Sequence, residues 1–174
     1  MMRAILGLLL ASMVVLTGCG SADPPATKDA DSTEETPSQS PSASPPRATP
    51  SADPGKQGRV IKTAGSDYGQ MLFDGAGQAI YLFDKETTSA PACYGQCAED
   101  WPPILTKGLP QARGGARQEL LGTTRRKDGS MQVTYDGHPL YSYTHEEPNQ
   151  VLCHNVSEYG GLWLVVTPSG EPAD

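Results

Sequence analysis

The stretch from Gly20 to Gln57 contains no Val, Ile, Leu, Met, Phe, Trp, Tyr or Cys. A segment without large apolar side chains cannot bury a core, so no folded domain is expected there. Its many Pro, Ser, Thr and Ala residues are typical of a disordered, partly extended chain. Such a chain spans about 35 Å root mean square between its ends when it is flexible. We therefore predict a disordered tether at 19–57, followed by a single domain at 58–174.

The sequence also lacks an excess of basic residues. Its 13 Lys and Arg against 20 Asp and Glu give a formal net charge of −7, which disfavours nucleic acid as a partner. The nearest approach to a basic patch is the run Arg125-Arg126-Lys127. Because Asp128 and Gly129 follow it, this run is most simply the tip of a β-hairpin.

No catalytic signature is present. The sequence has no Gly-x-Ser-x-Gly or similar nucleophile elbow, so neither His138 nor His145 has a nucleophile to activate. Acids in the predicted loops are more often solvated charges than a paired acid site; they are Asp84, Glu86, Glu146 and Glu147. We therefore expect a protein that is not an enzyme.

Residues 1–18 predict a secretory signal peptide. Arg3 is the only charged residue before the apolar run Ala4 to Val15, which is too short to span a bilayer comfortably. The run leads into Leu16-Thr17-Gly18-Cys19, which resembles the lipobox of bacterial lipoproteins, where cleavage precedes the cysteine. That resemblance implies a diacylglyceryl group on Cys19. Acyl chains of the palmitate type would hold the chain on the extracytoplasmic face of a bacterial cell membrane.

All 11 aromatic residues lie after residue 57, and the strand signals lie there too. β-prone runs separated by Gly-containing turns predict an all-β domain, with strands near 59–63, 71–73, 79–83, 119–124, 130–135, 139–143 and 162–167. In the third run, Ile80 and Leu82 alternate with Tyr81 and Phe83, and both faces are expected to be buried. Residues 94–100 predict a short helical turn, which Pro102 and Pro103 would stop. The Gly- and Pro-rich segment 106–115 predicts a surface excursion.

Two of the predicted hairpins have similar sequences, which indicates an internal repeat. Phe73-Asp74-Gly75 leads to Tyr81, and Tyr135-Asp136-Gly137 leads to Tyr141. Each tyrosine is followed five residues later by an acid, Glu86 or Glu146. The repetition predicts two related β-hairpin modules packed together.

These residues belong to motifs that resemble bacterial lipoproteins carrying the "secreted repeat of unknown function", whose pattern is Tyr-x-(Phe/Trp/Tyr)-x-x-Asp. The matching stretches are 82–86, 93–97, 101–103, 121–123, 136–141 and 160–163. In both copies glutamate takes the place of the final aspartate. The resemblance implies a secreted protein and brings no activity with it. The motif residues are Tyr81, Phe83, Glu86, Trp101, Tyr141, Tyr143 and Glu146.

With Cys19 lipidated, Cys93, Cys97 and Cys153 remain, so one is left over within a monomer. Loop entropy assigns about 2 kcal/mol to a bridge between Cys93 and Cys97, and about 4 kcal/mol to a bridge from either of them to Cys153. Encounter probability favours the short bridge instead. The resemblance implies that Cys93 and Cys97 are the family's pair, and we favour that disulfide.

An alternative site uses Cys93, Cys97, Cys153 and His154 to bind copper or to exchange thiols. Thiolates with an imidazole suit Cu(I) or Zn(II), and a Cys-x3-Cys pair with a distant His is similar to the copper site of Sco-type chaperones. However, no thioredoxin-like βαβ pattern is present, and no proline follows Cys97 directly. The favoured interpretation is an envelope lipoprotein without a cofactor that binds an unidentified envelope ligand or protein, or supports the cell surface.

Overall fold

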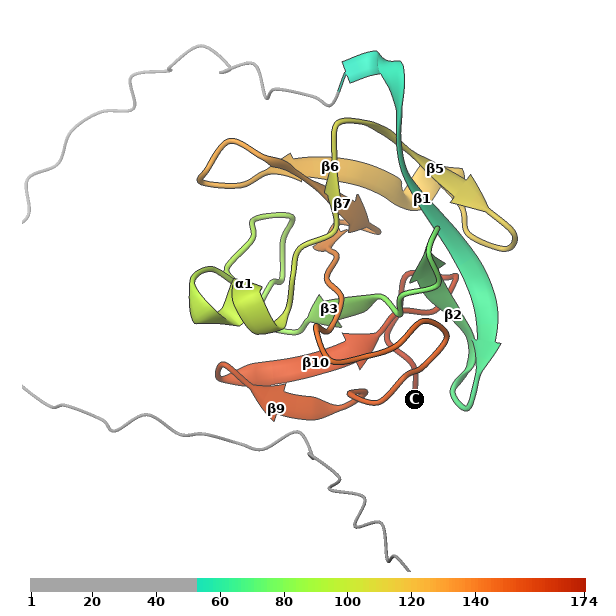
Figure 1. Ribbon diagram of the computed structural model, residues 1–174, viewed down its shortest axis with the longest axis vertical. Coiled ribbons are helices and arrows are strands. Elements are labelled where there is room, and N and C mark those ends of the chain that lie inside the picture. Colours follow the sequence, from blue (N-terminus) through green and yellow to red (C-terminus); the bar gives the residue numbers. More distant parts are fainter. Residues whose placement is uncertain (1–52) are drawn as a thin grey trace, which may run out of the picture.

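The computed structural model describes residues 53–174 (Figure 1). The predicted signal peptide, Cys19 and most of the predicted tether lie outside the described residues. The first strand begins at Asp53, inside the range predicted as tether. Apart from two short helices, the regular elements from there on are strands, so the prediction of an all-β fold is confirmed.

The strands form three small sheets. The first contains β1 (Asp53–Ser66), β2 (Gly69–Asp74) and β5 (Gly108–Arg113). The second contains β3 (Tyr81–Phe83), β9 (Val156–Glu158) and β10 (Gly161–Val165). The third contains β4 (Leu105–Thr106), β6 (Leu121–Arg125), β7 (Met131–Tyr135) and β8 (His138–Pro139). The helices are α1 (Gln96–Asp100) and the 3-10 turn η1 (Gln118–Leu120). No helix among residues 53–174 is long and apolar enough to cross a membrane.

Most of the predicted elements are present. β1 pairs with β2, and β6 pairs with β7, as antiparallel hairpins. The helical turn predicted at 94–100 is α1. Asp136 and Gly137 both have positive φ, 48° and 83°, as the tight turn between β7 and β8 requires.

The surface excursion predicted at 106–115 is wrong, because β5 occupies most of this segment and pairs in parallel with β1. Glycine and proline lower the strand propensity of this segment. They are accepted here because β5 lies at the edge of its sheet and its register with β1 is irregular. The two backbones also approach closely: a Cβ atom on Gly108 would overlap the carbonyl oxygen of Lys56.

Two packed clusters form the core, one on each side of β3. Ile80 and Leu82 join a mainly aliphatic cluster, whereas Tyr81 and Phe83 join a cluster rich in aromatic residues. All four side chains are buried, so the expectation that both faces of this run are covered is confirmed. β3 is therefore a central strand that separates the two clusters of the core.

The two modules, residues 59–104 and 119–166, exchange their last segments. Leu72 N donates to Val166 O (2.8 Å), and Val133 N donates to Ile104 O (2.8 Å). Val166 closes the hairpin of the first module although it ends the second, and Ile104 does the reverse. Each hairpin is thus completed by the other module, and neither module is a closed unit by itself.

Candidate functional site

The motif tyrosines lie where the two modules meet. Tyr81 N donates to Tyr141 O and Tyr141 N donates to Tyr81 O, both at 2.9 Å. This reciprocal exchange is the hydrogen-bonded pair of an antiparallel ladder. The contacts on either side of it repeat each other, as in a two-fold arrangement.

The motif glutamates are bound across the junction between the modules. The Tyr141 hydroxyl donates to Glu86 Oε1 at 2.6 Å, and the Tyr81 hydroxyl donates to Glu146 Oε1. The tyrosine of each module therefore binds the carboxylate of the other. Sequence reasoning placed each Tyr and Glu in one motif but had no signal for this crossing.

Each glutamate also closes a loop within its own module. Glu86 Oε1 accepts hydrogen bonds from Ala92 N (2.6 Å) and Cys93 N (3.2 Å). Glu146 Oε1 accepts from Leu152 N (2.6 Å) and Cys153 N (3.2 Å). The spacing of six and seven residues is identical in the two modules. Glutamate is thus long enough to reach both its own loop and the opposite tyrosine.

The four groups are perturbed by their burial. Removal from water raises the pKa of Glu86 and of Glu146 above that of an exposed glutamate. Burial, and then the neighbouring carboxylate, raises the pKa of Tyr81 and Tyr141 far above the ordinary range of a tyrosine. The second oxygen of each carboxyl, Oε2, is buried and has no hydrogen-bond partner among residues 53–174.

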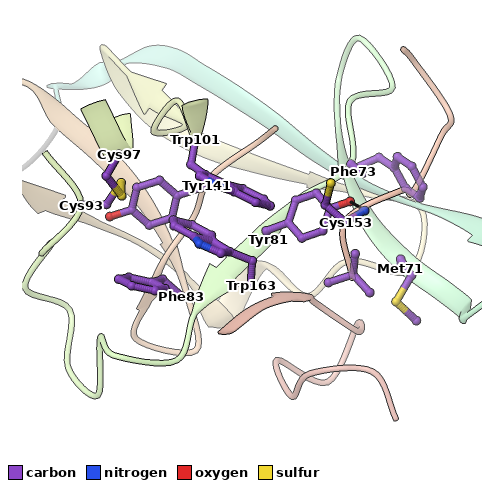
Figure 2. Close-up of a cluster of buried hydrophobic side chains, with 12 residues drawn as sticks. Met71, Phe73, Tyr81, Phe83, Cys93, Cys97, Trp101, Tyr141, Cys153 and Trp163 are labelled. Atoms are coloured by element: carbon purple, nitrogen blue, oxygen red, sulfur yellow. Dashed lines mark hydrogen bonds between the residues drawn. A yellow bond between two sulfur atoms is a disulfide. The ribbon is translucent and has the colours of Figure 1, made fainter. Parts of the chain in front are cut away.

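Two tryptophans stack at the centre of the aromatic cluster (Figure 2). The rings of Trp101 and Trp163 are 4.1 Å apart and nearly parallel. Tyr81 meets the edge of Trp101 at 5.2 Å, and Tyr141 meets Trp163 at 5.3 Å. The outer faces are covered by the opposite module: Phe83 stacks on Trp163, and Tyr143 packs on Trp101 with its ring tilted by 40°. The aromatic motif residues therefore pack against one another, and the hydroxyls of Tyr81 and Tyr141 are turned to the motif glutamates.

A disulfide joins Cys93 to Cys97, with Cα atoms 5.4 Å apart, which is the pairing that the sequence favoured. It fastens the loop after Glu86 to α1. Cys153 is fully buried and occupies the equivalent position after Glu146. Figure 2 shows the Cys153 side chain well apart from the disulfide.

The residues proposed for copper do not form a cluster. His154 Nδ1 accepts a hydrogen bond from Val165 N at 3.2 Å, and its ring lies 4.5 Å from that of Tyr68. Burial lowers the pKa of His154. Within residues 53–174, no group of three or more His, Cys, Asp or Glu side chains could hold a metal ion.

Sequence reasoning missed Arg126 and Gln132. Arg126 belongs to the predicted basic tip, yet it is buried and donates to Cys93 O (2.7 Å) and Gln132 Oε1 (2.6 Å). Gln132 in turn donates to Leu140 O at 2.8 Å. The guanidinium also lies 4.4 Å from the ring of Tyr94. Nothing in the run of three basic residues distinguishes the one that turns inward.

An open depression of about 420 Å³ lies beside the third sheet. Its lining is mainly apolar and consists of Leu105, Thr106, Lys107, Gly129, Ser130 and Met131. No motif residue contributes to it. Six of the seven motif residues thus belong to the interior of the fold, and a ligand in this depression would contact other residues.

The same duplication is found by comparison with known proteins. A family model described as "secreted repeat of unknown function" matches the chain twice, over residues 62–105 and 122–167. No curated protein and no solved structure matches it. The two matches coincide with the two modules and together cover more than half of the chain. The chain therefore belongs to the family of secreted repeats of unknown function, and is an extracytoplasmic protein.

Proposed function

We propose that this protein is a lipid-anchored module of the cell envelope that binds an envelope ligand or supports the cell surface, without catalysing a reaction. The observation that carries the proposal is the order of its segments. An apolar signal ends in the lipobox-like Leu16-Thr17-Gly18-Cys19, a tether without large apolar residues follows, and a compact pair of modules comes last. That order suits a folded domain displayed at a distance from a membrane.

The burial of the motif supports a binding or structural role over catalysis. Six of its seven residues are buried, and each Glu oxygen that faces a tyrosine already accepts three hydrogen bonds. A general acid or base must be within reach of a substrate proton. These carboxyls instead accept hydrogen bonds from backbone and tyrosine groups of the protein itself, so the motif stabilises the fold.

Lipid attachment is tested by replacing Cys19. We expect Cys19→Ser to abolish labelling of the protein by a clickable palmitate analogue in growing cells, because the acylated thiol is lost. The wild-type chain and the control Ser21→Ala, two residues downstream, should both be labelled and should sediment with membranes. A Cys19→Ser chain that is still labelled, or that still sediments with membranes, would refute the anchor.

The copper alternative is separated from this proposal by chemistry on the protein taken from its own envelope. The disulfide between Cys93 and Cys97 predicts two oxidised cysteines per unfolded chain and no stoichiometric copper. Thiol titration in denaturant, with and without prior reduction, and elemental analysis measure both quantities. Three reduced cysteines together with one copper ion per chain would favour the alternative.

A further inference from the structure

Charge is unevenly distributed along the folded part. Of the ten Lys and Arg residues from 53 to 174, nine lie in the segments 53–66 and 105–131, which contain only three acids. The remaining described residues have one basic residue, Lys85, against twelve acids. A chain that is acidic overall therefore has two segments with a net charge of +6.

These two segments lie together in the fold. β1 pairs with β5, and Arg125 in β6 faces Met131 in β7, which in turn faces Thr106 in β4. Figure 1 shows β1, β5 and β6 on one side of the molecule and β9 and β10 on the other. The positive charge is thus concentrated on one side.

The acids within these segments have partners there, whereas several cations have no acidic partner among residues 53–174. One of these cations, Lys127, lies 4.5 Å from the centroid of the Tyr94 ring. Asp53 pairs with Lys56, Glu119 pairs with Arg117, and Asp128 accepts hydrogen bonds from Ser130. Lys107, Arg125 and Lys127 are exposed, and none of them has an ion pair with another residue of the range 53–174. Their charges are available to a partner.

Two exposed leucines accompany these cations. Leu105 and Leu109 flank Lys107, and they are 39% and 42% exposed. Leu105 and Lys107 line the open depression together with Gly129, which follows the hairpin tip that contains Lys127. We name Leu105, Lys107, Leu109, Arg125 and Lys127 the basic face.

The tether reaches the fold at this face. Asp53, where the described chain begins, pairs with Gly108, between Lys107 and Leu109. A flexible tether of about 35 Å keeps the domain within reach of the lipid surface and raises the effective concentration of that surface at this face. Phosphate headgroups attract clustered Lys and Arg, and the adjoining acyl region accepts leucine.

We propose that the basic face docks on the anionic phospholipid headgroups of the membrane to which the protein is tethered. The inference rests on the proposed lipid anchor only for the proximity that the anchor provides. An anionic polymer would also attract the cations, but it offers nothing to Leu105 and Leu109. The two leucines are therefore the reason for choosing a lipid surface as the partner.

The first test uses the anchored full-length protein in vesicles. Lysine acetylation is followed by mass spectrometry in phosphatidylcholine vesicles with and without phosphatidylglycerol. Lys107 and Lys127 should react severalfold more slowly when the anionic lipid is present, and added salt should reverse the effect. Lys85, on the acidic part of the same chain, is the internal control and should change little.

The second test does not depend on the anchor. A chain of residues 20–174, which keeps the whole described part, is sedimented with phosphatidylglycerol vesicles at low salt. Since each basic residue near an anionic surface adds about 1 kcal/mol, the variant Lys107→Gln/Arg125→Gln/Lys127→Gln should bind about 100-fold more weakly. The matched control, Lys85→Gln/Gln150→Glu/Ser157→Glu, changes the net charge equally and should bind within about twofold of wild type.

The outcomes separate this inference from the proposed anchor. A missing lipid on Cys19 would refute the anchor, and the sedimentation test would still decide whether the face binds lipid. Equal binding by the triple variant and its control would overturn the inference, and so would equal acetylation of Lys107 in both kinds of vesicle. Binding to inorganic polyphosphate without binding to vesicles would also overturn it.

Discussion

The two modules have the same arrangement of motif residues but differ in the segment that connects the cysteine to the tryptophan. In the first, Cys93 leads to Trp101 through α1, a helix of five residues fastened by the disulfide. In the second, Cys153 leads to Trp163 through the hairpin of β9 and β10. A five-residue helix does not hold itself in water, whereas paired strands hold each other. The disulfide therefore supplies in one module what backbone pairing supplies in the other.

The residue after each cysteine is contacted by the hairpin of the opposite module, again in different ways. Arg126 and Lys127 lie over the ring of Tyr94, at 4.4 and 4.5 Å. Tyr68 packs on His154 at 4.5 Å. The position of the contact is common to both modules, but its chemistry is cationic in one case and aromatic in the other. Both modules thus have a contact from the opposite hairpin at this position, but the side chains that make the contact differ.

The largest effect is expected from the tryptophan stack, which both modules share. Trp101→Ala and Trp163→Ala should each lower the free energy of unfolding by about 4 kcal/mol, because each removes a fully buried indole. The double variant should lose less than the sum, since the first truncation already removes the stacking contact. Urea unfolding followed by circular dichroism measures all three.

Leu152→Ala is the control for these truncations, because this side chain is 60% exposed and should cost less than about 0.5 kcal/mol. A loss below about 1 kcal/mol for either tryptophan would show that the cluster is not shared equally by the modules.

The next effect tests the asymmetry. Cys93→Ala/Cys97→Ala should lower stability by about 2 kcal/mol, the loop entropy of so short a bridge. Amide hydrogen exchange should accelerate in α1 and remain slow in β10, because only α1 depends on the bridge. A reducing agent should reproduce the loss in the wild-type chain and leave the double variant unchanged. Equal acceleration in both segments would contradict the comparison.

Local sequence patterns predicted most of the strands and the two modules. They did not predict which tyrosine binds which glutamate, because that pairing is made by long-range contacts. Alternation in 79–83 indicated a strand buried on both faces, and the recurrence of Tyr and Glu indicated two modules, because both signals are local. The crossing of Tyr81 to Glu146 joins residues 65 apart, and no local pattern encodes which partner is chosen. β5 was missed for the same reason, since its place depends on pairing with β1 and not on its own propensity.

A smaller effect tests the crossing directly. In a double-mutant cycle, Tyr81→Phe and Glu146→Ala should show a coupling energy of about 1 kcal/mol, because each change removes the buried hydrogen bond that the two side chains share. Tyr81 and Glu86 belong to the same module but share no hydrogen bond with each other, so Tyr81→Phe and Glu86→Ala should show a coupling near zero. The reciprocal cycle with Tyr141→Phe and Glu86→Ala should match the first. Stronger coupling within a module than between modules would rule out the crossed arrangement.

The smallest effect distinguishes the two glutamates by pH. Burial raises the folded-state pKa of both Glu86 and Glu146 above the value of 4.5 for an exposed glutamate. The folded chain therefore binds these protons more tightly than the unfolded chain. Their contribution to stability is fully present below pH 4.5 and is lost as the pH rises through the folded-state pKa.

The slope attributable to either group should stay below about 1.4 kcal/mol per pH unit, the limit for one proton. Arg126 favours the charged form of Glu86, whereas no cation of the described range 53–174 contributes in this way to Glu146. Glu146→Gln should therefore remove more of the slope than Glu86→Gln, as measured by unfolding free energies from pH 4 upward. In glutamine the amide nitrogen takes the place of Oε2, which has no hydrogen-bond partner in the described part of the chain, while Oε1 keeps its three donors. The substitution thus removes the titration and keeps the hydrogen bonds of Oε1. A greater loss of slope in Glu86→Gln than in Glu146→Gln would show that Arg126 does not distinguish the modules.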